Sequence, residues 1–483
     1  MEKVIDQHIR TRYLVARPLS CNQHAYQKGK STESALVALI DKAERSLEDK
    51  QTALCAFLDI EGAFDNTPTA TILKGLNAKG VDITTTRWVE YMLSNRCAKV
   101  TLNEHSHNFY TTRGCPQGGV LSPLLWTLAV DLLLVIMADL DYDTQGYADD
   151  LVVVVRGPCL NTISTRLQGA LNTITRWCRE NELSINADKT VIVPFTRKRK
   201  LVRLTELRLN GKTLNLSNEV KYLGVTIDQK LTWNSHLNNI IQKAKMALWI
   251  CCRMAGAKWG LKPKMALWMY TAVVRPIITY ASVVWCNKTK QKTTMSKLDS
   301  IQRMACLIIT GAFHSAPGDA LNALLDIAPL YLHVQKEAKS CLYRLCTQSN
   351  VKLQSQYMNK LKELTFEHKT LKMPVDGMST EFNFAKQYQI DLPNRDMWLK
   401  NQESHKKGSH VWFTDGSKKG SDVGCGIYGL KPRFDMSVNL GKEATIFQAE
   451  VFAINKCAEV ILERKLRNQN IYINSDSQAA LLL

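Results

Sequence analysis

The stretch Gly146-Tyr-Ala-Asp-Asp-Leu-Val-Val-Val-Val155 decides the fold of this chain. Two adjacent carboxylates, Asp149 and Asp150, stand at a turn, and the four valines after them predict a strand that enters a core. Like charges side by side repel each other unless a cation is present, and Mg²⁺ prefers such oxygen ligands. A solvated turn is the commoner explanation of a lone Asp-Asp pair, so the pair must be judged with the sequence around it.

Outward from this stretch, strands alternate with long helices, which predicts an α+β or α/β fold. A third acid, Asp59, ends an apolar run of strand length. Residues 350–407 are polar and weakly periodic, which is typical of a linker. The expected elements are helices at 36–48, 121–140 and 159–182, a strand at 53–60, a hairpin at 97–113, a mostly helical region at 236–345 and strands from 411 to 428.

The charge of the chain is strongly localised. Its 483 residues carry a formal net charge of +19, with 63 Lys+Arg and 44 Asp+Glu. Residues 229–298 contain 12 bases and no carboxylate, and residues 189–212 contain eight bases and one acid. Such concentration predicts a polyanionic partner, nucleic acid first of all. The 14 Cys form no CxxC pair, which argues against a zinc ribbon or a disulfide scaffold and for an intracellular, reducing compartment.

Five sequence blocks occur in a fixed order: FLDIEGAFD (57–65), RGCPQGGVLSPLLW (113–126), GYADDL (146–151), NADKT (186–190) and KYLGVTID (221–228). In this order they resemble the reverse transcriptases of non-long-terminal-repeat, jockey-like retrotransposons. The resemblance implies an α+β right-hand polymerase with palm, fingers and a helical thumb. It also implies an RNA template, a DNA primer, an RNA–DNA hybrid and deoxynucleoside triphosphates as partners, and no membrane.

The resemblance assigns roles to single residues. Asp59 and Asp149 would bind two Mg²⁺, with Asp150 as the neighbouring carboxylate and Mn²⁺ as a substitute metal. The nucleotide site would contain Phe64 as a gate against the ribose 2′-hydroxyl, Gln117, Gly118 and Lys189. The primer grip would contain Tyr222, Leu223 and Gly224. One departure concerns nucleotide binding, because Gln27 and Lys30 stand where the family commonly has two arginines.

A second set of acids near the C-terminus resembles ribonuclease H. Asp415 follows an apolar strand start, Glu450 lies on a predicted helix, and Asp476 lies at a strand end. By resemblance these three carboxylates would hold two further Mg²⁺. Positions for the family's later His and fourth acid are lacking before Leu483, so we expect weak or no RNA cleavage.

The basic stretch after the primer grip resembles a thumb that holds duplex by its phosphates. The candidate contacts are Lys243, Lys245, Arg253, Lys258, Lys262 and Lys264. A solvated helix face is the alternative for these bases. The interleaved Trp233, Trp249, Trp259, Trp268 and Tyr270 are expected to be core residues, because aromatics at helical spacing usually pack inside.

These observations together predict a retrotransposon RNA-directed DNA polymerase, followed by a partial ribonuclease H-like domain. The alternatives are a decayed or repurposed copy that binds nucleic acid without polymerising, and a maturase-like RNA-binding cofactor. The expected domains are partial fingers at 1–50, a fingers and palm core with primer grip at 51–235, a basic helical thumb at 236–349, a linker at 350–407 and a truncated ribonuclease H-like domain at 408–483.

Overall fold

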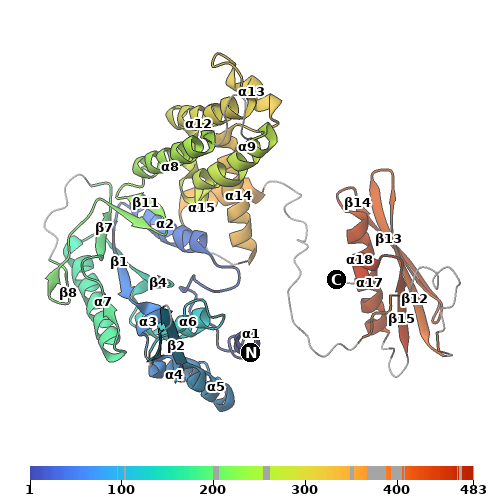
Figure 1. Ribbon diagram of the computed structural model, residues 1–483, viewed down its shortest axis with the longest axis horizontal. Coiled ribbons are helices and arrows are strands. Elements are labelled where there is room, and N and C mark those ends of the chain that lie inside the picture. Colours follow the sequence, from blue (N-terminus) through green and yellow to red (C-terminus); the bar gives the residue numbers. More distant parts are fainter. Residues whose placement is uncertain are drawn as a thin grey trace. The chain divides into compact units, whose positions relative to one another are not determined.

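The computed structural model describes residues 1–94, 96–102, 105–111, 113–198, 206–253, 261–348, 353–366, 388–392, 405–406, 408–464, 466 and 470–481. The chain forms two compact units, Met1–Pro374 and Val375–Leu483 (Figure 1). Each unit has a sheet and a hydrophobic core of its own.

An antiparallel sheet around β1 is the centre of the first unit. Its strands are ordered β4-β5-β1-β6, and β7 also pairs with β1. Their bounds are β1 Thr52–Glu61, β4 Asp143–Tyr147, β5 Asp150–Gly157, β6 Ser184–Ile185 and β7 Val191–Phe195. Because side chains alternate between the faces of a strand, β1 buries Leu54 and Leu58 on one face and Cys55 and Phe57 on the other. The predicted strands at 53–60 and in the valine run are confirmed, but the residues before Asp149, expected to be a turn, form β4.

Three helices cover the central sheet. The helices α6 (Ser122–Asp139) and α7 (Leu160–Glu180) pack on the Leu54 face, and α2 (Thr32–Glu48) packs on the Cys55 face (Figure 1). Within the described residues, α6 is apolar and long enough to cross a bilayer, and the bent pair Pro263–Thr279 and Ser282–Lys290 passes the same test if taken as one span. However, 67% of the α6 window is buried inside the unit, as expected of a core helix.

A third cluster of helices adjoins the N-terminal end of α6. Its core joins Ile9, Ile72, Val89 and Leu124. The helices here are α1 Glu2–His8, η1 Ile9–Tyr13, α3 Ala63–Asn66, α4 Thr69–Ala78 and α5 Ile83–Ser94, and the strands β2 Arg96–Leu102 and β3 His105–Thr111 follow α5 in the chain. β2 and β3 pair with each other, which confirms the predicted hairpin.

The remaining chain of the first unit forms two small hairpins and then a helical region. The elements are β8 Arg208–Leu209, β9 Lys212–Thr213, β10 Glu219–Tyr222, β11 Val225–Asp228, α8 Asn234–Cys252, α9 Pro263–Met269, η2 Tyr270–Val274, α10 Arg275–Thr279, α11 Ser282–Trp285, η3 Cys286–Lys290, α12 Lys292–Thr310, α13 Gly318–Leu324, α14 Leu330–Gln348 and α15 Gln356–Phe366. These helices share one core with the Cys55 face of the sheet, in which Phe57 and Val152 belong to the same cluster as Trp285 and Leu342.

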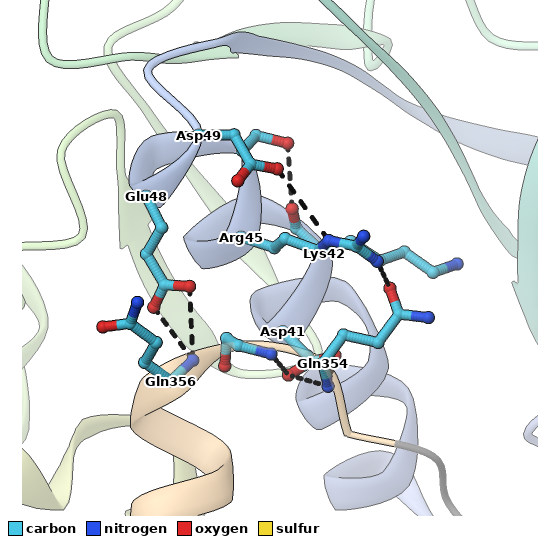
Figure 2. A network of polar contacts seen from close by, with 9 residues as sticks. Asp41, Lys42, Arg45, Glu48, Asp49, Gln354 and Gln356 are labelled. Carbon is cyan, nitrogen blue, oxygen red and sulfur yellow. Dashed lines mark hydrogen bonds and ion pairs between the residues drawn. The ribbon is translucent and has the colours of Figure 1, made fainter.

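The helix α15 corrects the predicted linker, which was expected to begin at residue 350. A network of polar contacts joins the start of α15 to α2 (Figure 2). The carboxylate of Asp41 accepts hydrogen bonds from the backbone N–H groups of Gln354, at 2.9 and 3.1 Å, and of Ser355, at 2.8 Å. Glu48 accepts from the N–H of Gln356 at 3.1 Å. These carboxylates satisfy amides that a helix leaves unpaired at its first turn.

The second unit is a four-stranded sheet with one long helix. The strand order is β14-β13-β12-β15, with β12 and β15 parallel and the other pairs antiparallel. The elements are β12 His410–Lys419, β13 Asp422–Gly429, β14 Phe434–Gly441, α17 Ile446–Glu463, β15 Ile471–Ser475 and α18 Gln478–Leu481. A capping box of Thr445 and Gln448 starts α17. One face of the sheet and α17 bury Trp412, Ile427 and Cys457.

Candidate active site

The three carboxylates of the first unit meet at the ends of neighbouring strands. Asp59 in β1 stands directly opposite Asp150 in β5, and Asp149 occupies the turn that precedes β5. The indole of Trp126 fixes this turn by donating from Nε1 to the carbonyl oxygen of Ala148 at 2.9 Å. The Asp149 carbonyl accepts from the N–H of Ile60 at 3.2 Å. Sheet register therefore brings together residues that lie about 90 positions apart in the sequence.

The negative charges at this point influence one another. Burial, followed by the charges of Asp149 and Asp59, raises the pKa of Asp150 to about 6. Lys189 partly compensates, because its Nζ lies 2.9 Å from Oδ2 of Asp59. Asn186 places that lysine: its side-chain oxygen accepts from the N–H of Lys189 at 3.1 Å, while its own N–H donates to the Asp59 carbonyl at 3.1 Å. Lys189, which we expected near an incoming triphosphate, thus contacts the Asp59 carboxylate directly.

Three of the residues predicted for a nucleotide site, Phe64, Gln117 and Gly118, lie on two segments that contact each other. The Phe64 carbonyl accepts from the N–H of Cys115 at 2.6 Å, which ties α3 to the loop that carries Gln117 and Gly118. Gln117 donates from Nε2 to Asp65 at 3.0 Å. Gly118 adopts φ 82°, and no atom lies within 4 Å of the position that a Cβ would take there. This loop therefore leaves open space beside its backbone.

The predicted primer-grip residues form the turn between β10 and β11. Leu223 and Gly224 have φ values of 45° and 81°, as a tight hairpin turn requires. The hydroxyl of Tyr280 donates to the Leu223 carbonyl at 2.8 Å and holds the turn. Tyr222 is only 4% exposed, and its ring packs 5.4 Å from that of Phe57. Its side chain thus attaches the hairpin to the central sheet, and burial raises the pKa of its phenol.

A cavity of about 520 Å³ separates this hairpin from the acids. Asp59, Asp150 and Lys189 line it from the sheet side, and Lys221 and Tyr222 line it from β10. The cavity leaves open space between the sheet and the β10–β11 hairpin, next to the carboxylates.

Residues 1–227, which contain the three acids, Phe64, Gln117, Gly118, Lys189 and the β10–β11 turn, match the family described as "Reverse transcriptase (RNA-dependent DNA polymerase)". Residues 1–227 are a reverse transcriptase domain. The resemblance deduced from the five sequence blocks is therefore confirmed, as is a fold of mixed helices and sheets.

Several curated relatives resemble the reverse transcriptase domain and the region after it. The chain is 25% identical over 331 residues to the 115 kDa protein in type-1 retrotransposable element R1DM of Drosophila melanogaster, covering 68% of this chain and 32% of that protein. It is 25% identical over 327 residues to the RNA-directed DNA polymerase from mobile element jockey of the same fly, covering 65% and 34%. The chain thus spans about a third of the length of these relatives.

Solved structures give more distant similarities. A telomerase from Candida albicans, in complex with a fragment of telomeric RNA, aligns with a TM-score of 0.34 and 11% identity, covering 75% of this chain and 56% of that one. A foamy viral protease-reverse transcriptase in complex with double-stranded DNA aligns with a TM-score of 0.23 and 12% identity, covering 89% and 51%.

The helices that follow the reverse transcriptase domain carry the predicted basic side chains at the surface. Lys243, Lys245, Arg253, Lys262 and Lys264 are exposed, and Lys258 lies outside the described residues. The expectation that the aromatic residues are core residues is only partly met. Trp233 and Tyr270 are buried, but Trp249 and Trp268 are 61% and 64% exposed, and Trp259 lies outside the described residues. The guanidinium of Arg253 lies 4.9 Å from the Trp249 ring centroid, so base and aromatic share one exposed surface.

The second unit brings its three predicted acids together. One carboxylate oxygen from each of Asp415, Glu450 and Asp476 lies within 4.8 Å of the other two. The approach of α17 to β12 depends on Gly416, where a Cβ would meet the backbone nitrogen of Glu450 at 2.8 Å. Burial raises the pKa of Glu450, and the charges of Asp476 and Asp415 raise it further. Its Oε2 is buried without a hydrogen-bond partner, which suits a carboxylate that receives a cation.

The sequence did not indicate two residues that shape the first site. Trp126, quoted only within a motif, supports the turn before Asp149 and also contacts Phe64, with ring centroids 6.1 Å apart. Tyr26 contacts Phe64 from another side, with centroids 6.3 Å apart. Each is a single aromatic whose neighbours come from distant segments, so no local spacing could have singled it out.

Proposed function

We propose that this chain is an RNA-directed DNA polymerase that extends a DNA primer on an RNA template with deoxynucleoside triphosphates. The observation that carries the proposal is the pairing of Asp59 with Asp150 across two strands, with Asp149 beside them, inside a reverse transcriptase domain. The similarity to the RNA-directed DNA polymerase from mobile element jockey supports the same activity.

The acids of the central sheet suit divalent metal. They are oxygen donors, Asp59 and Asp150 are partly buried, and burial followed by the charges of Asp149 and Asp59 raises the pKa of Asp150 to about 6. Two Mg²⁺ held there would stabilise the attacking and leaving oxygens of a phosphoryl transfer. Asp59 and Asp149 would hold both ions, and Asp150 would add charge beside them. Lys189, whose Nζ lies 2.9 Å from Oδ2 of Asp59, would hold that carboxylate in its orientation.

Other parts of the first unit would position the substrates. Phe64 and the loop of Gln117 and Gly118 would receive the incoming nucleotide, and the β10–β11 turn would place the primer end across the cavity. The exposed bases of α8 and α9 would bind duplex phosphates as a thumb does, which gives affinity without sequence preference.

A second activity is proposed for the second unit, in the class of ribonuclease H. The cluster of Asp415, Glu450 and Asp476, with an unpartnered oxygen on Glu450, supports divalent metal binding. Carboxylates that hold two such ions suit hydrolysis of the RNA strand of a hybrid.

Primer extension tests the main proposal. The full chain is given a DNA primer on an RNA template with Mg²⁺ or Mn²⁺, and Asp149→Asn is the matched variant because it keeps size and removes charge. We expect extension by the wild type and a loss of at least about 100-fold in the variant, since the loss of a transition-state electrostatic contact costs that much. If the wild type extends no better than Asp149→Asn, the chain is a nucleic-acid-binding protein without polymerase activity. Asp415→Asn separates the two activities, because only RNA cleavage should respond to it.

A further inference from the structure

Tyr26 contacts Phe64 and belongs to the segment in which Gln27 and Lys30 depart from the family pattern. Its ring stands edge-on to Phe64, at a centroid distance of 6.3 Å and an interplanar angle of 85°. The charge of Asp149 adds to burial in raising the pKa of its phenol, so the hydroxyl lies within electrostatic range of that acid. The side chain is 43% exposed, and part of it therefore remains accessible to a ligand.

The backbone of Tyr26 is held in a conformation that a tyrosine rarely adopts. Its φ is 56°, in the left-handed region that disfavours residues with a Cβ. Arg10, itself anchored by Asp6 at 2.9 Å, donates from Nη1 to the Tyr26 carbonyl at 3.0 Å. Strained residues of this kind persist only where the surroundings fix them, and they concentrate at functional sites.

The segment around Tyr26 is fixed to the central sheet. The N–H of His24 donates to the Gly146 carbonyl at 2.9 Å, and the N–H of Gly146 donates to the Asn22 carbonyl at 3.0 Å. Gln27 and Lys30, the departures from the family pattern, hold the same loop, because each donates from its side chain to the Gln23 carbonyl, at 2.9 and 2.8 Å. These two side chains are therefore used to fix the position of Tyr26.

Phe64 contacts two aromatic rings. Tyr26 contacts it on one side, and Trp126 contacts it at 6.1 Å with an interplanar angle of 43°. Trp126 also bonds the Ala148 carbonyl, so the contacts run from Tyr26 through Phe64 to the turn that carries Asp149. A ring can exclude a sugar hydroxyl only if it cannot move away from it.

We infer that Tyr26 is a specificity-determining residue of the nucleotide site, which fixes the Phe64 ring against the sugar of the incoming nucleoside triphosphate and so sets the discrimination of deoxyribose from ribose. The inference rests on the proposed polymerase function and names a residue that acts on its selectivity. Tyr26 acts through Phe64 as a positioning residue.

The test compares dATP with ATP as substrates for the full chain on an RNA template. For Tyr26→Ala we expect the ratio of kcat/KM for dATP to that for ATP to fall about 2- to 12-fold, which corresponds to one aromatic pair contact. Tyr26→Phe keeps the ring and should keep the ratio. Tyr26→Gly removes the ring and relieves the backbone, so it should match Tyr26→Ala. The control is Tyr110→Ala in the exposed hairpin, where the side chain is 80% exposed. It should leave the ratio unchanged.

A binding measurement separates the inference from the proposed function. Dissociation constants for dATP and ATP are measured with Ca²⁺ in place of Mg²⁺, and thermal melting checks that each variant is folded. If the wild type extends primers and all variants share its ratio, the inference alone is overturned. If the wild type does not extend but prefers dATP in a manner that depends on the Tyr26 ring, the inference stands and the polymerase proposal fails. Binding of neither nucleotide overturns both.

Discussion

Replacing Asp41 with alanine should release the start of α15 from α2. The Asp41 carboxylate is 5% exposed and accepts from two backbone amides, those of Gln354 and Ser355, at 2.8 to 3.1 Å (Figure 2). Hydrogen bonds to a charged group contribute about 1.5–3 kcal/mol each, and loss of a helix cap costs about 0.5–2 kcal/mol. Because the bonds and the cap are the same contacts, we expect a loss of about 3 kcal/mol in the local opening free energy.

Hydrogen exchange measures this loss locally, so the presence of two units in the chain does not complicate it. A loss of about 3 kcal/mol corresponds to roughly 100-fold faster exchange of amides in residues 356–366. Asp49→Ala, directly after the C-terminal end of α2, is the matched control. Its side chain is 52% exposed and only 3.8 Å from Arg45, a contact of at most about 0.5 kcal/mol. Equal exchange in the wild type and in Asp41→Ala would refute the reasoning.

Three further predictions concern other groups. Burial raises the pKa of Glu44 to about 8, helped by Glu48 and Asp41 and opposed by Ser355 and Arg197. Because the folded value lies above the ordinary value of 4.5, this group's stabilisation should be lost as pH rises through about 8. Glu44→Gln should then melt higher than the wild type at pH 9, and an unchanged melting curve would contradict this. Neutralising Lys243, Lys245 and Lys264 together should reduce the slope of log affinity for duplex against log salt by about 0.9 per lost phosphate contact. An unchanged slope would show that these lysines are solvated and do not contact phosphates. Mn²⁺ at 100 times its dissociation constant should stabilise the second unit by about 2.7 kcal/mol, as measured by thermal melting. Asp415→Asn should lose that gain, and a gain that persists would place the ion elsewhere.

Local patterns were sufficient to predict the two strands that carry the acids, β1 and β5, but not β4, β6 and β7 of the same sheet. The valine run after Asp150 and the apolar run before Asp59 each specify a buried strand, and the ordered motifs identify the carboxylates between them. The hairpin at 97–113 and the helices at 36–48, 121–140 and 159–182 follow from periodicity in the same way. These elements can be predicted from local sequence because the pattern of apolar residues that specifies each one lies within the element itself.

Other features depend on contacts that local spacing does not contain. The helix α15 begins where Asp41, more than 300 positions earlier, accepts its first amides, so its weak periodicity suggested a linker. Helical spacing placed Trp249 and Trp268 on a face but could not show that this face is exposed. The contact of the Tyr222 ring with Phe57 likewise joins residues more than 160 positions apart, which no local spacing indicates.

The core shared by the sheet and the helical region has a consequence for how much chain is needed to fold. Leu36 near the N-terminus and Leu361 in α15 belong to the same hydrophobic cluster. If the 227 residues of the reverse transcriptase domain were produced alone, α8 to α15 would be missing. The part of the apolar Cys55 face that these helices cover would then be exposed. During synthesis this face can be fully covered only after more than 100 further residues have left the ribosome. The segment that matches the reverse transcriptase family is therefore shorter than the segment needed to complete the hydrophobic core.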